Sequence, residues 1–193
     1  MLHKIIRVFF RFPFLQKNTL VKKSWVYFHL GLRYIFYMVD YSIVRGELSS
    51  DLEDDFVSLG RLAYEESSFS SLIDYDEAKM LGIARTYSIS ENKVLFIASD
   101  GDVVVGIFAG YHSPWFFSND SVARDVVWYV REEYRSLGVG IDLLSLFEEW
   151  SWESGASAIL LGQDSGIDTT KFSRILESKG YGFIGANYSL RSR

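Results

Sequence analysis

The sequence predicts an α/β fold in which a mixed, mostly antiparallel sheet is flanked by helices. Two observations carry this prediction. The apolar runs at residues 93–99 and 103–111 are joined by an Asp-Gly turn, and Asp-Gly between two apolar runs is a strong hairpin signal. Further on, the β-branched and aromatic run 126–130 is followed by a helical pattern and another short apolar run, which is typical of a parallel crossover. Together they predict an antiparallel meander that ends in one parallel connection.

The composition is that of a globular protein with a substantial core. The chain has 193 residues, of which 48% are hydrophobic and 17% aromatic. It contains no cysteine, which excludes a disulfide scaffold, a zinc-thiolate site and a cysteine nucleophile. This composition suits a reducing compartment, so we expect a cytoplasmic protein. The three histidines are far apart in the sequence, and we expect no metal site.

Charge is divided unevenly along the chain. Residues 1–45 carry eight Lys and Arg residues and one acid, a net charge of +7. Residues 46–193 carry twelve Lys and Arg residues and twenty-four acids, a net charge of −12. An acidic body repels nucleic acid and favours cationic ligands. We therefore expect no nucleic-acid binding through the body, and the opposite charge preference in the N-terminal part.

Residues 1–40 form a basic, aromatic extension that we expect to be helical. Lys4, Arg7 and Arg11 fall on one face of a helix with apolar residues around them, and Pro13 would end that helix. The aromatic run 25–39 is interrupted by charge and lacks the roughly 18 uncharged apolar residues of a transmembrane helix. The preferred role is packing on the body, on a protein partner or on a second copy. Peripheral membrane contact and nucleic-acid contact are the alternatives.

The body, residues 41–193, is expected to follow the order β-α-α-β-β-β-α-β-α-β. Side chains that accept from backbone N–H groups start the helices, at Ser49 or Ser50 for the first and at Asp74 for the second. The acidic first turn of the first helix also suits the helix dipole. The expected strands are 41–45, 93–99, 103–111, 126–130, 158–161 and 181–190, and the expected helices are 51–66, 74–87, a segment between Gly140 and Gly155, and 168–179.

The turn after residue 130 contains Arg135, Gly138 and Gly140 and leads into an amphipathic helix. The first turn of a helix has free N–H groups, and glycine lets the backbone come close to a phosphate. The pattern therefore predicts a phosphate-bearing cofactor held by main-chain donors. The alternative is a dinucleotide-binding fold, whose fingerprint is G-x-G-x-x-G. Leu143 occupies the third glycine position here, and this argues against that alternative.

This order of elements, with Arg135-x-x-Gly138-x-Gly140 at a strand–helix junction, resembles the GNAT superfamily of N-acetyltransferases. Its signature at this place is Arg/Gln-x-x-Gly-x-Gly/Ala. Residues 130–140 are similar to the wider family pattern V-x-P-E-Y-R-G-x-G-x-G and lack its proline and one small residue. Residues 176–181 are similar to the family's Y-E-K-x-G-F. The chain also resembles phage-encoded acetyltransferase-like proteins in three short motifs, Glu66-Ser67-x-Phe69, Pro114-Trp115-Phe116 and Phe147-Glu148-x-Trp150.

The resemblance, which covers residues 41–190, implies acetyl-CoA or another acyl-CoA as the cofactor. It places the pyrophosphate on the N–H groups of residues 137–141, with Arg135 adding charge. It pairs the pantetheine arm with the backbone of residues 129–131, where a bulge parts this strand from the next. Gln163 stands where the family often has an asparagine that touches the cofactor. The residues so implied in cofactor binding are Tyr129, Val130, Arg131, Arg135, Ser136, Leu137, Gly138, Val139, Gly140, Ile141 and Gln163.

The resemblance also implies direct attack of an amine on a thioester, which calls for a base and an acid. Asp125 is the first candidate for the base because it opens the strand on the acceptor side, and Glu132 is the second. Each is alternatively a solvated carboxylate or a strand-end cap. Leu176 stands where the family commonly has a tyrosine, and it cannot donate a proton. Tyr181 and Ser173 are the nearby substitutes, with core packing and a solvated helix face as their alternative roles.

Other conspicuous residues have structural interpretations. His112 ends a strand and is expected to be a hydrogen-bonded loop histidine. The aromatic residues 115–117 either cover an acceptor or close the core. Trp152 lies opposite the apolar face of its helix, so we expect the N-terminal extension or a partner subunit to cover it.

The sequence thus predicts an acetyl-CoA-dependent N-acetyltransferase that acts on an amine of a small molecule or protein. Two alternatives stay open. One is a GNAT-fold assembly or structural protein, such as a phage component, located in the virion or the host cytoplasm. The other is a CoA-binding module with little or no catalysis. Leu176, the N-terminal extension and the outward Trp152 motivate the first of these alternatives.

Overall fold

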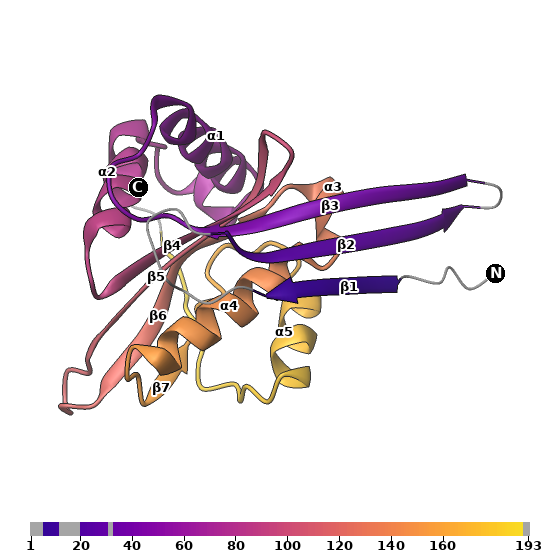
Figure 1. Cartoon of the computed structure of the whole chain (residues 1–193). Coiled ribbons are helices and arrows are strands. Elements are labelled where there is room, and N and C mark those ends of the chain that lie inside the picture. The colour runs from indigo at the N-terminus through magenta and orange to yellow at the C-terminus, as the bar shows by residue number, and fades with distance from the viewer. Residues whose placement is uncertain (1–5, 12–19, 31–32, 191–193) are drawn as a thin grey trace.

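A single sheet forms the centre of the molecule (Figure 1). The computed structural model describes residues 6–11, 20–30 and 33–190, with side chains for Ser24 and residues 37–190. In this part of the chain the strands follow one another across the sheet in chain order, and all neighbours are antiparallel except β6 and β7, which are parallel. The strands are β1 (Ile6–Arg11), β2 (Leu20–Leu30), β3 (Arg33–Ile43), β4 (Lys93–Asp100), β5 (Val103–Pro114), β6 (Ser121–Val130) and β7 (Ala158–Leu160).

Helices cover both faces of the sheet. The first two long helices lie on one face and contribute Phe56 and Met80 to its core, whereas the later ones lie on the other face, where Leu143 and Phe147 are fully buried (Figure 1). None of the described helices is both long and apolar enough to cross a membrane. The helices are α1 (Ser50–Glu66), the short η1 (Ser68–Ser71), α2 (Glu77–Ile89), α3 (Glu132–Arg135), α4 (Val139–Glu153) and α5 (Thr169–Ser178).

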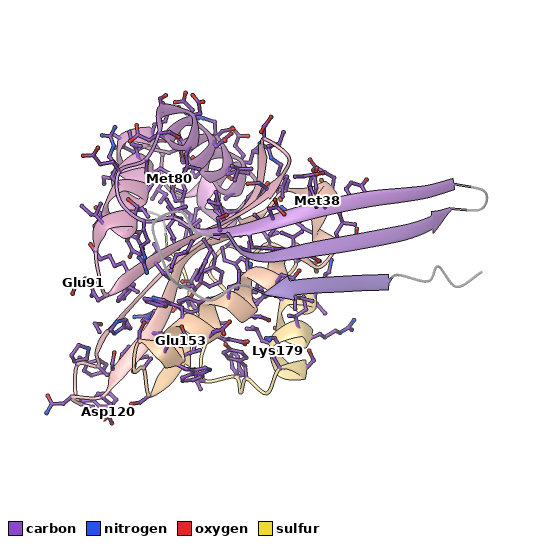
Figure 2. The ribbon with its side chains drawn as sticks, viewed as in Figure 1. Met38, Met80, Glu91, Asp120, Glu153 and Lys179 are labelled. Carbon is purple, nitrogen blue, oxygen red and sulfur yellow. The ribbon has the colours of Figure 1, made fainter. Side chains whose placement is uncertain are left out.

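Strand β4 shows how the sequence builds both cores. Successive side chains of a strand point to opposite faces of the sheet. Val94 and Phe96 are fully buried beneath α4, and Leu95 between them is fully buried beneath α1 and α2. On the latter face Met80 lies between helix and sheet (Figure 2), and a Cβ at Gly60 of α1 would come within 2.6 Å of it. Glycine therefore permits the close approach of α1 and α2.

The body follows the predicted order up to α5, with shifts at the element ends. Ser49 caps α1 by accepting from the Leu52 N–H at 3.4 Å. The cap of α2 is Asp76, whose carboxylate accepts from the Lys79 N–H at 3.1 Å. The prediction of Asp74 as this cap is wrong, because residues 74–76 are not helical, Asp76 has an extended backbone, and the helix begins only after it.

The described part of the N-terminal extension consists of strands, and the predicted helix is wrong for residues 6–11. This segment forms β1 and pairs antiparallel with β2, while Lys4 and Pro13 of the predicted helix lie outside the described residues. Valine, isoleucine and aromatic residues favour strands, and pairing satisfies their backbone groups. β3 then crosses residue 40 and pairs with β4 over residues 39–43, so one sheet includes both the extension and the body.

The last described segment, residues 181–190, forms neither helix nor strand, and the predicted closing strand is wrong. Phe183, Ile184 and Tyr188 are each more than 80% exposed. Glycines at two positions of this segment weaken a strand, and the nearest edge strand, β7, is short. The apolar alternation of the segment therefore has no neighbouring strand to pair with in this structure.

Candidate functional site

Strands β6 and β7 part at Asp125. Their parallel pairing ends at Arg124 and Leu160, after which β6 continues without a neighbour on this side. On its other side β6 bulges at Val126, because Asp125 and Val127 pair with consecutive residues of β5. Val126 is 41% exposed, although the sequence predicts a buried strand here. The bulge and the parting together open the sheet beside Asp125.

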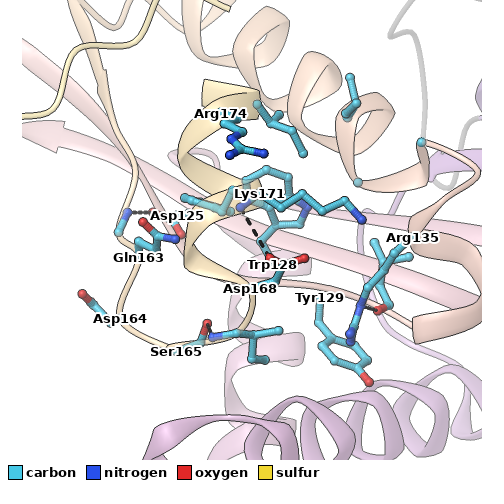
Figure 3. A pocket seen from close by; sticks show the side chains of 18 of the residues that line it. Asp125, Trp128, Tyr129, Arg135, Gln163, Asp164, Ser165, Asp168, Lys171 and Arg174 are labelled. Atoms are coloured by element: carbon cyan, nitrogen blue, oxygen red, sulfur yellow. Dashed lines mark hydrogen bonds between the residues drawn. The ribbon is translucent and has the colours of Figure 1, made fainter. Parts of the chain in front are cut away.

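A cavity of about 700 Å³ occupies this opening (Figure 3). Its walls come from β6, from the turn between α3 and α4, from residues 162–168 and from α5. Phe69 of η1 adds a wall on the α1 side. This volume is within the usual range for small-molecule and cofactor sites, which is roughly 300–1,000 Å³. The strand, the glycine turn and the helix that are joined at the Arg135–Gly140 motif therefore all border this cavity.

The start of α4 forms one end of the cavity. Gly138 has φ 76° and ψ 16°, a left-handed conformation that glycine adopts without strain. The first hydrogen bond of α4 runs from the Asp142 N–H to the Gly138 carbonyl at 3.1 Å. The N–H groups of residues 139–141 precede this bond and are left for an outside acceptor. Gly140 and Ile141 line the cavity, so these donors can meet an anion there.

Arg135 ties this turn to β6 and to α1. Its Nε donates to the Val130 carbonyl at 2.8 Å, and its Nη2 donates to Glu66 Oε2 at 2.6 Å. The Tyr129 hydroxyl donates to the other oxygen of Glu66, and the Arg135 guanidinium lies 5.2 Å from the Tyr129 ring centre. Burial, followed by the hydrogen bond to Glu66, raises the pKa of Tyr129, so this hydroxyl keeps its proton. Arg135 therefore fixes the loop, and Glu66 is the anion that holds it.

Asp125 lies at the opposite end of the cavity. The Gly162 N–H donates to its Oδ1 at 2.8 Å. Burial raises the pKa of Asp125 from the ordinary 3.8 to about 6, partly offset by the hydrogen bond from Gly162, while the nearby Asp164 raises it further. A half-buried carboxyl with a pKa near 6 is deprotonated at neutral pH and is still basic enough to accept a proton. Its environment suits the predicted role of a general base.

Tyr181 borders a second cavity, of about 680 Å³, which lies between α4, α5 and residues 180–185. Its hydroxyl donates to Glu148 Oε1 at 3.0 Å, and Lys179 pairs with the same carboxylate at 2.8 Å. Burial, then the charge of Glu148, raises the pKa of Tyr181, and the charge of Asp125 contributes as well. Tyr181 thus lies near Asp125 but borders the other cavity, and its hydroxyl proton is hydrogen-bonded to Glu148.

Besides Tyr181, four predicted site residues have side chains outside the first cavity. Glu132 begins α3 and is exposed, and Arg131 donates from its Nε to the Val104 carbonyl at 3.1 Å. The Arg131 N–H is taken by the Val105 carbonyl at 2.9 Å, so it faces β5. Leu137 and Val139 are buried in the core beneath the sheet, which leaves only their backbone for a ligand. The cavity does include side chains or backbone of Tyr129, Val130, Arg135, Ser136, Gly138, Gly140, Ile141 and Gln163.

Gln163 lines both cavities and ties the intervening wall together. Its Nε2 donates to the Thr169 carbonyl at 2.6 Å, and its Oε1 accepts from Ser173 at 3.2 Å. Both ends of this amide therefore hold the start of α5. Ser173 faces the second cavity, so it lies on the same side of the wall as Tyr181.

Sequence reasoning missed the α5 wall of the first cavity. Lys171, Phe172 and Arg174 all line it, and the Phe172 ring lies 5.0 Å from that of Trp128 (Figure 3). The spacing 171 and 174 puts two cations on one face of a helix, and this was the available signal. Nothing local in the sequence shows that this face borders the cavity.

The remaining predicted candidates lie away from the cavity. The Nδ1 of His112 is 2.9 Å from the Ser121 hydroxyl, and its ring packs 5.5 Å from Trp150, as a structural histidine would. Trp115, with its neighbours at 116 and 117, forms an aromatic cluster at the tip of the β5–β6 hairpin. Trp152 is 54% exposed and lines the second cavity. Among the described residues no group of three or more His, Cys, Asp or Glu side chains could hold a metal ion.

The chain matches the profile of the acetyltransferase (GNAT) family over residues 49–172, more than half of its length. No sequence of a curated protein matches it. Its fold is similar to that of several acetyltransferases of known structure. One is an aminoglycoside acetyltransferase from an uncultured soil metagenomic sample, with 15% identity and a TM-score of 0.60 over 80% of this chain and 99% of that chain.

Two further structures are comparable. The aminoglycoside N-acetyltransferase AAC(6')-Iy in complex with CoA has 13% identity and a TM-score of 0.63, over 80% of this chain and 95% of that chain. The ribosomal-protein-alanine N-acetyltransferase from Brucella melitensis biovar Abortus 2308 has 14% identity and a TM-score of 0.56, over 80% and 99%. These likenesses confirm the predicted mixed, mostly antiparallel α/β fold. With the family profile matched from α1 to the first turn of α5 and the turn at Gly138 in place, this chain belongs to the acetyltransferase (GNAT) family.

Proposed function

We propose that this protein is an N-acetyltransferase that uses acetyl-CoA, or another acyl-CoA, and acts on an amine of a small molecule or protein. One observation carries the proposal. A single cavity has the free N–H groups at the start of α4 at one end and a carboxyl group of pKa about 6 at the other. The first suits phosphates and the second suits proton transfer from an amine.

The residues of this cavity fit CoA. The N–H groups of residues 139–141 would bind the pyrophosphate, helped by the partial positive charge of the helix N-terminus. Arg135 already donates to Val130 and Glu66, so its main task is to fix the turn. Beyond Asp125 the β6 backbone lacks a strand neighbour on the β7 side, which leaves room for an extended pantetheine arm. When bound, acetyl-CoA supplies the reactive thioester.

Asp125 is the proposed base. Its carboxylate is held by the Gly162 N–H at the parting of β6 and β7, so it faces the place where the thioester would lie. An amine acceptor is an ammonium ion at neutral pH and must lose a proton before attack. The net charge of −12 on residues 46–193 attracts such a cation. An amine acceptor also agrees with the N-acetyltransferase names of two similar structures.

A proton donor for the leaving thiolate is not evident among the described residues. Leu176 is partly buried against the core, and the hydroxyls of Tyr129 and Tyr181 already donate to carboxylates. A thiol with a pKa near about 8.5 can leave as the thiolate, so catalysis does not require this donor. The same observation favours a second candidate function, a CoA-binding module with little or no turnover.

Calorimetric titration with acetyl-CoA, combined with a thiol-release assay over a panel of amines, tests the proposal. If the protein is an enzyme, it should bind acetyl-CoA with micromolar affinity and release thiol only when an amine is present. Asp125→Asn should abolish this release. Binding without release for any amine would support the module. No binding at millimolar acetyl-CoA would refute both.

Several finer predictions rest on the sequence alone. One is the division of the chain into an extension of residues 1–40 and an acetyltransferase domain of residues 41–193. Another is the binding of a partner, or self-association, through the extension and Trp152. The last two are a cytoplasmic location and the kinship with phage-encoded proteins. Deleting β1 and β2 and measuring the oligomeric state from the molecular mass in solution tests self-association through the extension. An unchanged oligomeric state would refute it.

A further inference from the structure

The α5 wall of the first cavity carries two cations. Lys171 and Arg174 both line the cavity, and neither forms an ion pair with any described residue. The other two cations of the cavity are engaged. Arg135 pairs with Glu66, and the Arg124 guanidinium lies 5.5 Å from the Trp115 ring centre. Two unneutralised charges in a cavity of an acidic body call for an anionic ligand.

The α5 cations and the acidic side chains lie at different ends of the cavity, apart from Arg124 beside Asp125 and Asp168 at the start of α5. Residues 171 and 174 are three apart in α5, so they share one face of the helix, and Figure 3 shows Lys171 extending across the cavity toward Arg135. Asp125 and Asp164 lie at the other end, beside the parting of the strands (Figure 3). The Asp168 carboxylate accepts from the Lys171 backbone N–H at 3.4 Å and so serves as the cap of α5. An anion is therefore favoured between α5 and the start of α4.

We propose that Lys171 and Arg174 bind the 3′-phosphate of the CoA ribose and make the site selective for CoA over 3′-dephospho-CoA. This inference rests on the proposed use of CoA. CoA carries a pyrophosphate and a separate phosphate monoester, and the monoester holds a charge between −1.5 and −2 near pH 7. The uncharged N–H groups at the start of α4 suit the pyrophosphate. The monoester needs charge, which a lysine point charge and an arginine fork supply.

Calorimetry with two ligands isolates this contact. CoA and 3′-dephospho-CoA are each titrated into the full chain, into Lys171→Gln and Arg174→Gln, and into the double variant. Glutamine keeps helix propensity and removes the charge. Lys79→Gln is the matched control, because it removes one exposed charge from α2, away from the cavity.

The wild-type protein is expected to bind CoA about tenfold more tightly than 3′-dephospho-CoA, since two partly exposed ion pairs each strengthen binding by about threefold. Each single variant should lose about threefold in CoA affinity, and the double variant should bind both ligands equally. Affinity for 3′-dephospho-CoA should change less than twofold in every variant, which also shows that the variants are folded. The selectivity should fall as salt rises.

Three outcomes would overturn the inference. Equal binding of both ligands by the wild-type protein would exclude a 3′-phosphate contact. An equal loss of affinity for both ligands in the double variant would show that the two cations act on the pyrophosphate, or through the overall electrostatic potential of the cavity, and not on the 3′-phosphate. Failure of the wild-type protein to bind either ligand would overturn the proposed function together with the inference, and it is distinct from the first two results because these require binding.

Discussion

Replacing Asp125 with asparagine should stabilise the protein at neutral pH while removing the proposed base. The pKa of this carboxyl is raised from 3.8 to about 6, chiefly by burial. That difference corresponds to about 3 kcal/mol between the charged and neutral forms in the folded state. Asparagine is neutral at every pH and keeps an oxygen that can accept from the Gly162 N–H, the present partner of Asp125.

The pH dependence follows from linkage. Below pH 3.8 the Asp125 carboxyl is protonated in both the folded and the unfolded chain and contributes nothing. Between about pH 4 and 6 the unfolded chain releases the proton and the folded chain retains it, so the unfolded state gains. Above pH 6 the cost of the buried charge is constant. Asp125→Asn should therefore raise the free energy of unfolding by about 1–3 kcal/mol at pH 8 and by almost nothing at pH 4.

Urea unfolding of both proteins between pH 4 and 8 measures this difference directly. The thiol-release assay over the same range should show wild-type kcat/KM rising through an apparent pKa near 6 and a loss of 10²–10⁴-fold in the variant. Asp120→Asn, an exposed carboxylate at the tip of the β5–β6 hairpin (Figure 2), is the control, and its effect should not vary with pH. A destabilised variant, or a stability difference independent of pH, would refute the assignment of a buried, high-pKa carboxyl.

Four other perturbations test the site. In Gly140→Ala the new methyl would lie 3.5 Å from Trp128 Nε1, an ordinary contact, so unfolding should change by less than about 1 kcal/mol while acetyl-CoA binding weakens about tenfold. Gly138→Ala should instead lower stability by about 1–2 kcal/mol in urea unfolding, because φ is 76°. Glu66→Gln should raise the KM for acetyl-CoA several-fold in steady-state kinetics and leave kcat within twofold, because only one of the two atoms that replace the carboxylate oxygens is an acceptor. An unchanged KM would show that Glu66 does not position the loop. Tyr181→Phe should lower kcat less than about threefold and stability by about 1 kcal/mol; a hundredfold loss of kcat would make it the acid.

The sequence could predict elements whose signals are local. The β4–β5 hairpin and α1 were found from a turn dipeptide and a cap with an acidic first turn. The helix predicted for the extension is wrong because a spacing of four, as between Arg7 and Arg11, fits one side of a helix and equally one side of a strand. The choice depends on pairing with β2, which local spacing does not reveal. At the other end, residues 181–190 alternate but find no strand to join.

The candidate site divides in the same way. The glycine turn of Gly138 was evident from its motif, because a left-handed residue before a helix leaves a local trace. Glu66 is 69 residues from Arg135, and only folding brings the two together. The raised pKa of Asp125 likewise comes from burial at the parting of two strands. Lys171 and Arg174 look like a solvated helix face until the cavity is known.

Strand β3 belongs to the projecting β2–β3 hairpin and also contacts the start of α4. It pairs with β2 along most of its length but with β4 only over residues 39–43 (Figure 1). From that short segment the buried Tyr41 hydroxyl donates to Asp142, in the first turn of α4, at 2.8 Å. The Tyr37 ring meets Tyr134 of α3 at 6.0 Å between centroids. Two tyrosines of β3 thus contact the two helices on either side of the turn at Gly138, so the position of that turn depends on residues of the hairpin as well as on the body.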